Sequence, residues 1–222
     1  MLVEKNAPLQ TCNTFGIAAR AQALVRVRSA QDVQNVLTHP TLARAGLFVL
    51  GGGSNIVLTG DVSATVLKME IKGRRLLHES DTQWVVEAGA GESWHDTVAW
   101  TLAQGWPGLE NLALIPGTVG AAPVQNIGAY GVELQDRFHS LVALDLHTGQ
   151  PFTLNAAQCA FGYRDSVFKH AAPQRPGRVP TALGMGLAGR AVITHVRFAL
   201  RKDWRAELSY LKKKKKCTQE GV

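Results

Sequence analysis

The amino-acid sequence predicts an α+β fold arranged as two lobes, residues 1–73 and 74–205. Three observations lead to this prediction. Short β-type runs alternate with a few helix signals, the two halves of the chain differ in the order of these signals, and no internal repeat relates the halves. The length of 222 residues agrees with this, because domains average roughly 150 residues and the chain therefore forms one to two of them.

The first lobe begins with a strand, a helix and a second strand. Residues 24–27 (L-V-R-V) favour a strand, and Ser29 followed by Asp32 has the pattern of a capping box that starts a helix. Pro40 follows the end of that helix. Residues 47–50 (L-F-V-L) form a compact apolar strand, which runs directly into the glycine-rich residues 51–55.

The second lobe has a different order of elements. Residues 84–88 (W-V-V-E-A) predict a strand, and Ser93 is placed to cap a helix that ends before Gly105. Residues 141–154 contain two apolar runs around the turn H-T-G-Q, which is typical of a β-hairpin. Residues 192–200 alternate in polarity and predict the last strand.

Composition and charge are those of a globular protein. Hydrophobic residues make up 45% of the chain and charged residues 18%, which excludes a disordered chain. The formal net charge is +7, but five positive charges form the run Lys212 to Lys216, so the rest of the chain carries only +2. The basic character therefore belongs to a tail, and we expect no nucleic-acid partner.

Cysteine usage and the absence of apolar targeting segments favour the cytoplasm. The three cysteines at positions 12, 159 and 217 are too few and too scattered for a disulfide framework or a zinc site, so we expect no metal. The N-terminus has no apolar core of the length that an export signal needs. Residues 111–132 carry no charge, yet their prolines and side-chain amides are incompatible with a spanning helix. We therefore expect no membrane partner.

Residues 51–55 (G-G-G-S-N) form the first candidate site. Successive glycines permit positive φ angles, so that backbone N–H groups converge on an anion such as phosphate. Ser54 and Asn55 add side-chain donors. The alternative is a plain turn, and the spacing alone leaves both interpretations open.

The uncharged residues 116–131 form the second candidate site. They consist of small residues, amides and one aromatic residue, Tyr130. Small residues let the backbone approach a flat ligand closely, and Gln125 and Asn126 can hydrogen-bond it without charge. The alternative is a tightly packed loop. Because buried loops leave backbone groups without partners, a large embedded cofactor explains the segment better.

Residues 161–166 (F-G-Y-R-D-S) form the third candidate site. Arg164, flanked by Tyr163 and Asp165, can serve as one half of a surface ion pair. It can also be held in place to stabilise negative charge that develops during a reaction. The spacing does not decide between these two functions.

Six short motifs, taken in order, resemble the UDP-N-acetylenolpyruvoylglucosamine reductases, the MurB family of peptidoglycan synthesis. The similarity covers about residues 10–210. The motifs lie at residues 13–16, 51–55, 107–110, 115–120, 125–131 and 161–166. Both the order and the content of the motifs match the family pattern.

The resemblance implies a two-lobed FAD-binding fold of the vanillyl-alcohol-oxidase (PCMH) type, with FAD held between the lobes. In this reading residues 51–55 contact the pyrophosphate and residues 116–131 wrap the rest of the cofactor. The implied cofactor-binding residues are Gly51, Gly52, Gly53, Ser54, Asn55, Pro116, Gly117, Gly120, Ala121, Gln125, Asn126 and Gly128.

The resemblance also implies a reaction. NADPH reduces the flavin, and the flavin then passes a hydride to the enolpyruvyl double bond of UDP-N-acetylglucosamine enolpyruvate. The family places its catalytic arginine in the G-Y-R-D-S motif, which makes Arg164 the implied catalytic residue. Tyr130, Tyr163 and Tyr210 are the implied substrate contacts. We expect a monomer.

The match to the family pattern stops after Tyr210. Residues 206–222 form a divergent lysine-rich tail, whereas family members continue into a substrate domain with a proton-donating serine and an assisting glutamate. We expect the tail to be a frame-shifted or truncated end and the chain alone not to turn over. Two alternatives are a non-catalytic fragment that only binds flavin and an adaptor that uses its lysines to bind nucleic acid or membranes.

Overall fold

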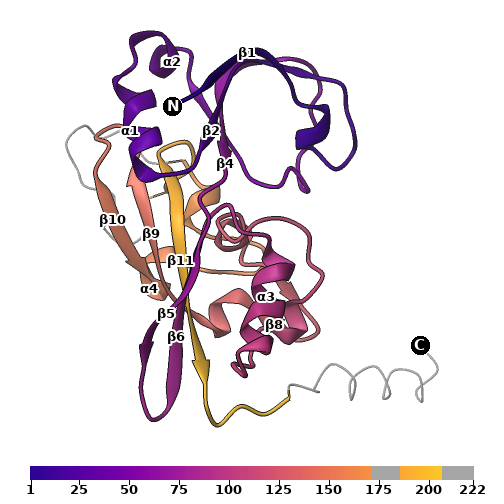
Figure 1. The fold of residues 1–222 in the computed structure, drawn as a ribbon, viewed down its shortest axis with the longest axis vertical. Coiled ribbons are helices and arrows are strands. Elements are labelled where there is room, and N and C mark those ends of the chain that lie inside the picture. The colour runs from indigo at the N-terminus through magenta and orange to yellow at the C-terminus, as the bar shows by residue number, and fades with distance from the viewer. Residues whose placement is uncertain (172–185, 207–222) are drawn as a thin grey trace.

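The first lobe is built on a mixed four-stranded sheet (Figure 1). The structure is a computed structural model that describes residues 1–171 and 186–206. The sheet has the order β1-β2-β4-β3, in which β1 and β2 are antiparallel and β4 is parallel to both of its neighbours. Its strands are β1 (Val3–Pro8), β2 (Arg20–Val27), β3 (Leu47–Leu50) and β4 (Val62–Met69).

Two helices connect β2 to β3. The predicted capping box is confirmed, because Ser29 accepts a hydrogen bond from the backbone of Asp32 and the Asp32 side chain accepts one from Ser29. The helices are α1 (Ala30–Thr38) and α2 (Pro40–Arg44). Val33 and Val36 of α1 are fully buried, so this helix stabilises the lobe through its apolar face.

The second lobe is built on an antiparallel five-stranded sheet with the order β10-β9-β11-β6-β5. The predicted hairpin is confirmed as β9 and β10, and the predicted last strand lies within β11. The strands are β5 (Arg74–Glu79), β6 (Gln83–Gly89), β9 (Phe138–Asp145), β10 (Pro151–Asn155) and β11 (Ala191–Arg201). Helices and sheets together confirm the α+β class.

Helix α3 (Trp94–Ala103) covers one face of this sheet. Ser93 caps it as predicted, and Trp94 packs edge-on against Phe198 of β11 with ring centroids 5.7 Å apart. The remaining elements are short. They are α4 (Ala156–Cys159), β7 (Gly128–Ala129), β8 (Val132–Glu133) and the 3₁₀ turns Gln10–Cys12, Glu110–Leu112, Ala122–Gln125, Leu134–Asp136 and Val167–Lys169.

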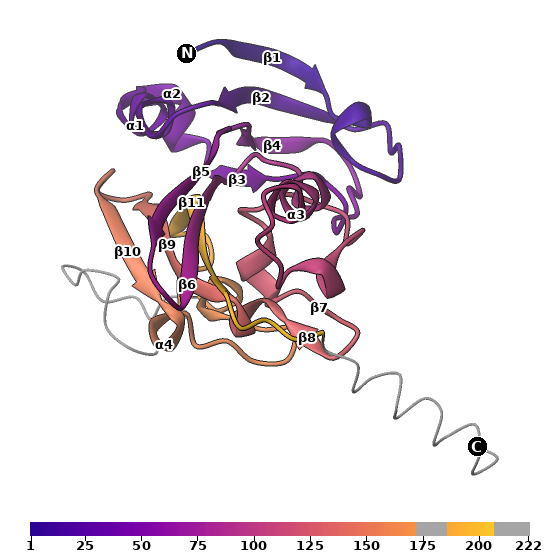
Figure 2. The same ribbon diagram turned by 60° about the horizontal axis from the view of Figure 1, so that its bottom comes forward.

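The two lobes share an apolar core, and Figure 2 shows the first sheet lying across the end of the second. Val27 and Leu67 of the first lobe belong to the same buried cluster as Leu144 and Val192 of the second. A Cβ atom at Gly91 would lie 2.5 Å from backbone atoms of Glu70, so the end of β6 meets the connection between the lobes at closest approach.

A row of charges crosses the face of the second sheet opposite α3. Glu87 of β6 is paired in register with Arg75 of β5 and Arg197 of β11. Its carboxylate accepts hydrogen bonds from both guanidinium groups, at 2.6 Å and 2.7 Å. Burial alone would raise the pKa of Glu87, but the hydrogen bonds from Arg197 and Arg75 lower the pKa below its ordinary value.

We expect Glu87→Gln to lower the free energy of unfolding by about 1–3 kcal/mol at neutral pH, because it leaves two charged donors without their carboxylate. A carboxylate with a depressed folded pKa stabilises the protein above its unfolded pKa and loses this effect as pH falls. The difference between the two proteins should therefore shrink below about pH 4. Urea unfolding across pH measures it, with exposed Asp81→Asn in the β5–β6 turn as control. A constant difference down to pH 2 would contradict the prediction.

Candidate functional site

Residues 51–55 leave the end of β3 as a loop whose third position requires glycine. Gly53 has a φ of 70°, and a Cβ atom there would lie 1.9 Å from the carbonyl oxygen of Cys12. Gly52 comes so close to the second lobe that its Cβ would lie 3.1 Å from the Cα of Gly117. The loop is therefore wedged between the 12–14 segment and the 117–121 segment.

The backbone N–H groups of residues 52–55 donate to no acceptor in the part of the chain that the structure describes. The loop carbonyls are used differently, because Thr14 donates to the Gly53 oxygen at 3.1 Å and the Lys68 ammonium donates to the Gly51 oxygen. With carbonyls bonded and N–H groups free, the loop has the polarity of an anion-binding nest.

Thr118 is the polar group of the facing segment. Its Oγ1 is buried and has no hydrogen-bond partner among residues 1–171 and 186–206. A Cβ atom at Gly51 would lie 2.8 Å from this oxygen, so the hydroxyl faces the start of the glycine loop. An unsatisfied buried hydroxyl costs about 1–3 kcal/mol, and a bound ligand would supply the missing partner.

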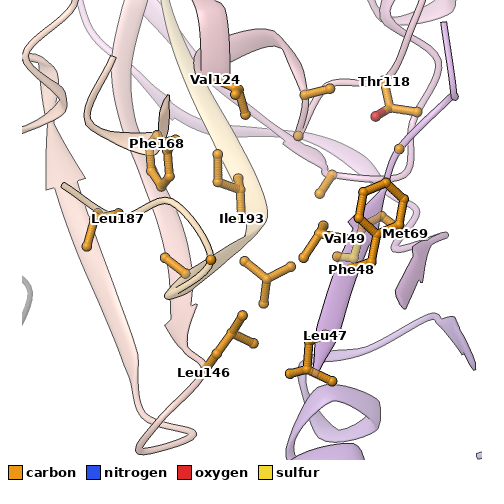
Figure 3. Close-up of a pocket in the computed structure, with 17 residues that line it drawn as sticks. Leu47, Phe48, Val49, Met69, Thr118, Val124, Leu146, Phe168, Leu187 and Ile193 are labelled. Atoms are coloured by element: carbon orange, nitrogen blue, oxygen red, sulfur yellow. The ribbon is translucent and has the colours of Figure 1, made fainter. Parts of the chain in front are cut away.

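A cavity of about 310 Å³ lies between the lobes next to these two segments (Figure 3). Leu47 and Phe48 of β3 and Met69 of β4 form the wall from the first lobe, and Phe168 and Ile193 contribute to the wall from the second. Gly51, Thr118, Gly120 and Ala121 also line it. Small and apolar walls of this kind suit a flat aromatic ligand.

Side-chain amides connect the two segments. Asn55 donates to the side-chain oxygen of Gln125 at 3.2 Å, which links the loops of the two lobes. Ser54 lies beside Gly117, whose φ is 122°. Gly120 is required for packing, because its Cβ would lie 2.5 Å from that of Ala90, and Pro116 is exposed.

Asn126 is fully buried and its amide is used within the protein. It donates to the carboxylate of Glu133 at 2.9 Å and to the Gly162 carbonyl at 3.0 Å, and it accepts from the backbone of Gln135 at 3.0 Å. These bonds hold its left-handed backbone, with φ at 44°. The residue therefore joins the second candidate segment to the third.

Arg164 lies at the tip of a tight turn closed by paired backbone hydrogen bonds between Gly162 and Asp165. Its φ is 54°, and its guanidinium donates to the Gly128 carbonyl at 2.8 Å. Lys169 holds the Arg164 carbonyl from the other side at 2.7 Å. The turn thus fixes an exposed cation beside residues 128–131.

Two tyrosines stand at the surface beside this turn. Tyr130 is 61% exposed and Tyr163 is 85% exposed. Leu114, also 77% exposed, and Tyr130 have positive φ angles of 62° and 50°, like those of Asn126 and Arg164. Backbone strain of this kind concentrates at functional sites. Tyr210 and the tail beyond residue 206 lie outside the described residues.

Comparison with known protein sequences shows the family to which the chain belongs. A family of FAD binding domains matches residues 21–155 of the chain. The UDP-N-acetylenolpyruvoylglucosamine reductase of Azoarcus sp. (strain BH72) is 53% identical over 208 residues, or 92% of this chain. The chain belongs to this family of FAD-binding reductases. The relative from Burkholderia orbicola (strain MC0-3), with the same name, is 51% identical over 215 residues, or 97% of this chain.

The resemblance inferred from six motifs is thereby confirmed. The chain spans 55% of the length of the Azoarcus relative and 57% of that of the Burkholderia relative. Among solved structures, MurB from Thermus caldophilus matches 99% of this chain with a TM-score of 0.67 at 24% identity, and covers 69% of its own chain. The flavoprotein MtVAO615 from Myceliophthora thermophila C1 matches 83% of this chain and 32% of its own, with a TM-score of 0.55 at 18% identity. These likenesses confirm the vanillyl-alcohol-oxidase type of fold.

The residues of this family member fit FAD. The cavity between the lobes offers apolar walls, the 52–55 loop offers free N–H groups, and Thr118 offers an unpaired hydroxyl. Within residues 1–171 and 186–206, no helix is long and apolar enough to cross a membrane, and no group of three or more possible metal ligands occurs.

Two residues of the site were not singled out from the sequence. Thr118 lies inside a recognised motif, but its single hydroxyl gave no separate signal. Lys68 gave no signal at all, because a lysine in a β-strand is ordinarily an exposed residue. Only the position of β4 beside β3 shows that it reaches the glycine loop.

Proposed function

We propose that the chain binds FAD between the lobes formed by residues 1–73 and 74–205. The unpaired Thr118 hydroxyl at the junction of the glycine loop and the apolar cavity carries this proposal. A ligand that combines flat rings with phosphate would use both features at once, and FAD is such a ligand.

In this proposal residues 51–55 would hold the diphosphate of FAD through the free N–H groups of residues 52–55, the Ser54 hydroxyl and the Asn55 amide. The other residues proposed for the cofactor site are Pro116, Gly117, Gly120, Ala121, Gln125, Asn126 and Gly128, and all of them except Asn126 are proposed to contact FAD directly. Among these, Asn126 acts by holding the backbone of its segment, since its amide bonds Glu133 and Gly162. Gly120 and Ala121 line the cavity, and their small size would leave room for the rings of FAD.

We further propose that the protein serves the reduction of UDP-N-acetylglucosamine enolpyruvate to UDP-N-acetylmuramate in cell-wall synthesis, with NADPH as reductant. The flavin supplies the redox chemistry. Arg164, fixed through Gly128 and Lys169, stabilises the negative charge that develops on the enolpyruvyl carboxylate as the double bond accepts a hydride. Tyr130 and Tyr163, exposed beside it, and Tyr210 contact the substrate.

The setting of this function is also part of the proposal. The chain acts as a monomer in the cytoplasm and supports cell shape and division through peptidoglycan synthesis. Cys12 and Cys159 are free thiols, which is the usual state of cysteine in a reducing compartment. Burial raises the pKa of the Cys159 thiol to about 12, which keeps it in the unreactive thiol form.

We expect the purified chain to bind FAD, either as isolated or after reconstitution. Bound flavin should absorb at roughly 450 nm and quench tryptophan fluorescence, since the cofactor brings its own chromophore. Riboflavin is the control, because it has the rings but lacks the diphosphate. A colourless protein that cannot be reconstituted with FAD would contradict the proposal.

Substrate-dependent oxidation of NADPH separates two candidate functions. Consumption of NADPH that requires UDP-N-acetylglucosamine enolpyruvate would establish turnover by this chain. Flavin binding without such consumption would assign the chain the function of a non-catalytic flavin-binding fragment. NADH in place of NADPH tests the preference between the two nicotinamide nucleotides.

A further inference from the structure

Lys68 of β4 has an unusual position for a lysine. Its side chain is half-buried and its ammonium donates to the carbonyl of Gly51, at the start of the glycine loop. It forms no ion pair with any carboxylate of residues 1–171 and 186–206. A partly desolvated positive charge without a counter-ion is costly unless something else compensates it.

The cations near Lys68 form ion pairs, whereas Lys68 forms none within the described part of the chain. Arg26 is paired with Glu4 and Glu70, and Lys72 lies 3.7 Å from Glu92. Burial lowers the pKa of the Lys68 ammonium, and the nearby Cys12 and Glu70 offset this only in part. Glu70 therefore lies near Lys68 without forming an ion pair with it, because its carboxylate is paired with Arg26 and Arg28.

A second cavity, of about 520 Å³, opens at this lysine. It is lined by Arg28, Lys68, Met69, Glu70, Lys72, Gly91 and Thr118. Arg28 is paired with Glu70 at 3.4 Å and Lys72 with Glu92 at 3.7 Å, so Lys68 is the cation of this lining that has no ion pair among the described residues. The second cavity shares Thr118 and Met69 with the apolar cavity, so the two cavities adjoin at these residues.

We propose that Lys68 is a binding residue for the diphosphate of FAD and supplies the positive charge that the uncharged glycine loop lacks. This inference rests on the proposed function, which names FAD as the ligand, and extends it by one residue and its role. Backbone N–H groups position an anion, whereas an ammonium at the same loop adds a charge-assisted interaction.

We expect Lys68→Met to weaken FAD binding about ten- to hundredfold and to leave riboflavin binding unchanged, because only FAD carries the diphosphate. Lys68→Arg should keep most of the affinity for FAD. Lys5→Met is the matched control, since it removes the same charge from an exposed position on β1 of the same lobe. Fluorescence titration of each variant with FAD and with riboflavin measures these affinities.

Thermal unfolding without cofactor distinguishes binding from a structural role. If Lys68 only held the Gly51 carbonyl, Lys68→Met would lower the Tm of the cofactor-free protein. If it serves the diphosphate, removal of an uncompensated charge should keep or raise that Tm and reduce the rise in Tm on adding FAD. Higher salt should also weaken FAD binding less in the variant than in the unaltered chain.

The titrations separate the role of Lys68 from the binding of FAD by the chain as a whole. Equal FAD affinity in Lys68→Met and the unaltered chain overturns the role of Lys68 and leaves flavin binding intact. Equal loss of FAD and riboflavin affinity overturns it as well, because it would show damage to the whole site. No FAD binding by the unaltered chain removes the proposed function and this inference together.

Discussion

Gly53→Ala is expected to abolish FAD binding and to lower the free energy of unfolding by about 3 kcal/mol, since it adds both backbone strain and overpacking. The φ of 70° at Gly53 already disfavours any side chain. A Cβ atom there would lie 1.9 Å from the Cys12 oxygen and 2.8 Å from the Cα of Asn13, and both neighbours are backbone atoms. Neither can move like the end of a flexible side chain.

The segment that Gly53 meets is itself held firmly. The Asn13 amide donates to the carbonyls of Leu9 and Ile17 at 2.8 Å and 3.1 Å, and its oxygen accepts from the Ile17 backbone at 3.0 Å. The 51–55 loop must therefore shift instead, which displaces the free N–H groups of residues 52–55. Denaturant unfolding and FAD titration measure the two consequences.

Gly60→Ala is the control for this substitution. Gly60 has no heavy atom within 4 Å of an added Cβ and no positive φ is found there. Alanine at such a position should leave stability unchanged or raise it by about 0.4–1 kcal/mol through the unfolded state. Wild-type FAD affinity in Gly53→Ala would refute the structural requirement derived above.

The local elements of this fold are readable from sequence, because their signals are local. The Ser29 capping box, the Ser93 cap and the hairpin of β9 and β10 each depend on residues a few positions apart. The strands β1, β4 and β5 and the two-residue strands β7 and β8 were not predicted. β4 (V-S-A-T-V-L-K-M) lies between β2 and β3, and its pairing with strands far away in sequence defines it more than its own pattern does.

The candidate site also has a part that sequence motifs predict and a part that depends on the fold. Sequence motifs identify the glycine loop and Arg164, yet the roles of single side chains depend on partners brought in by the fold. The Asn126 amide bonds Gly162, 36 positions away, and Lys68 reaches Gly51, 17 positions away. Composition cannot reveal that the Asn126 amide finds its hydrogen-bond partners within the protein. Nor can it reveal that Lys68 forms no ion pair in the described chain.

The local geometry of Arg164 gives its removal a specific expected effect. The guanidinium uses one N–H group on the Gly128 carbonyl, and its other donors meet no acceptor among residues 1–171 and 186–206. They are therefore free to bind a carboxylate in a bidentate manner. The closed turn and the left-handed φ of 54° keep this fork in place before any substrate arrives.

Arg164→Ala should slow hydride transfer to the enolpyruvyl group by about 10²–10³-fold, which is the usual effect of losing one electrostatic donor. Arg164→Lys should recover only part of this, since lysine keeps the charge but loses the fork. Reduction of the flavin by NADPH should change little. Stopped-flow kinetics of the two half-reactions measures these effects, in a protein that joins this chain to the part of a relative that it does not span.

Arg44→Ala, which removes an exposed charge on α2, is the control. Equal slowing of both half-reactions would show that Arg164 supports the site as a whole and does not act on the carboxylate.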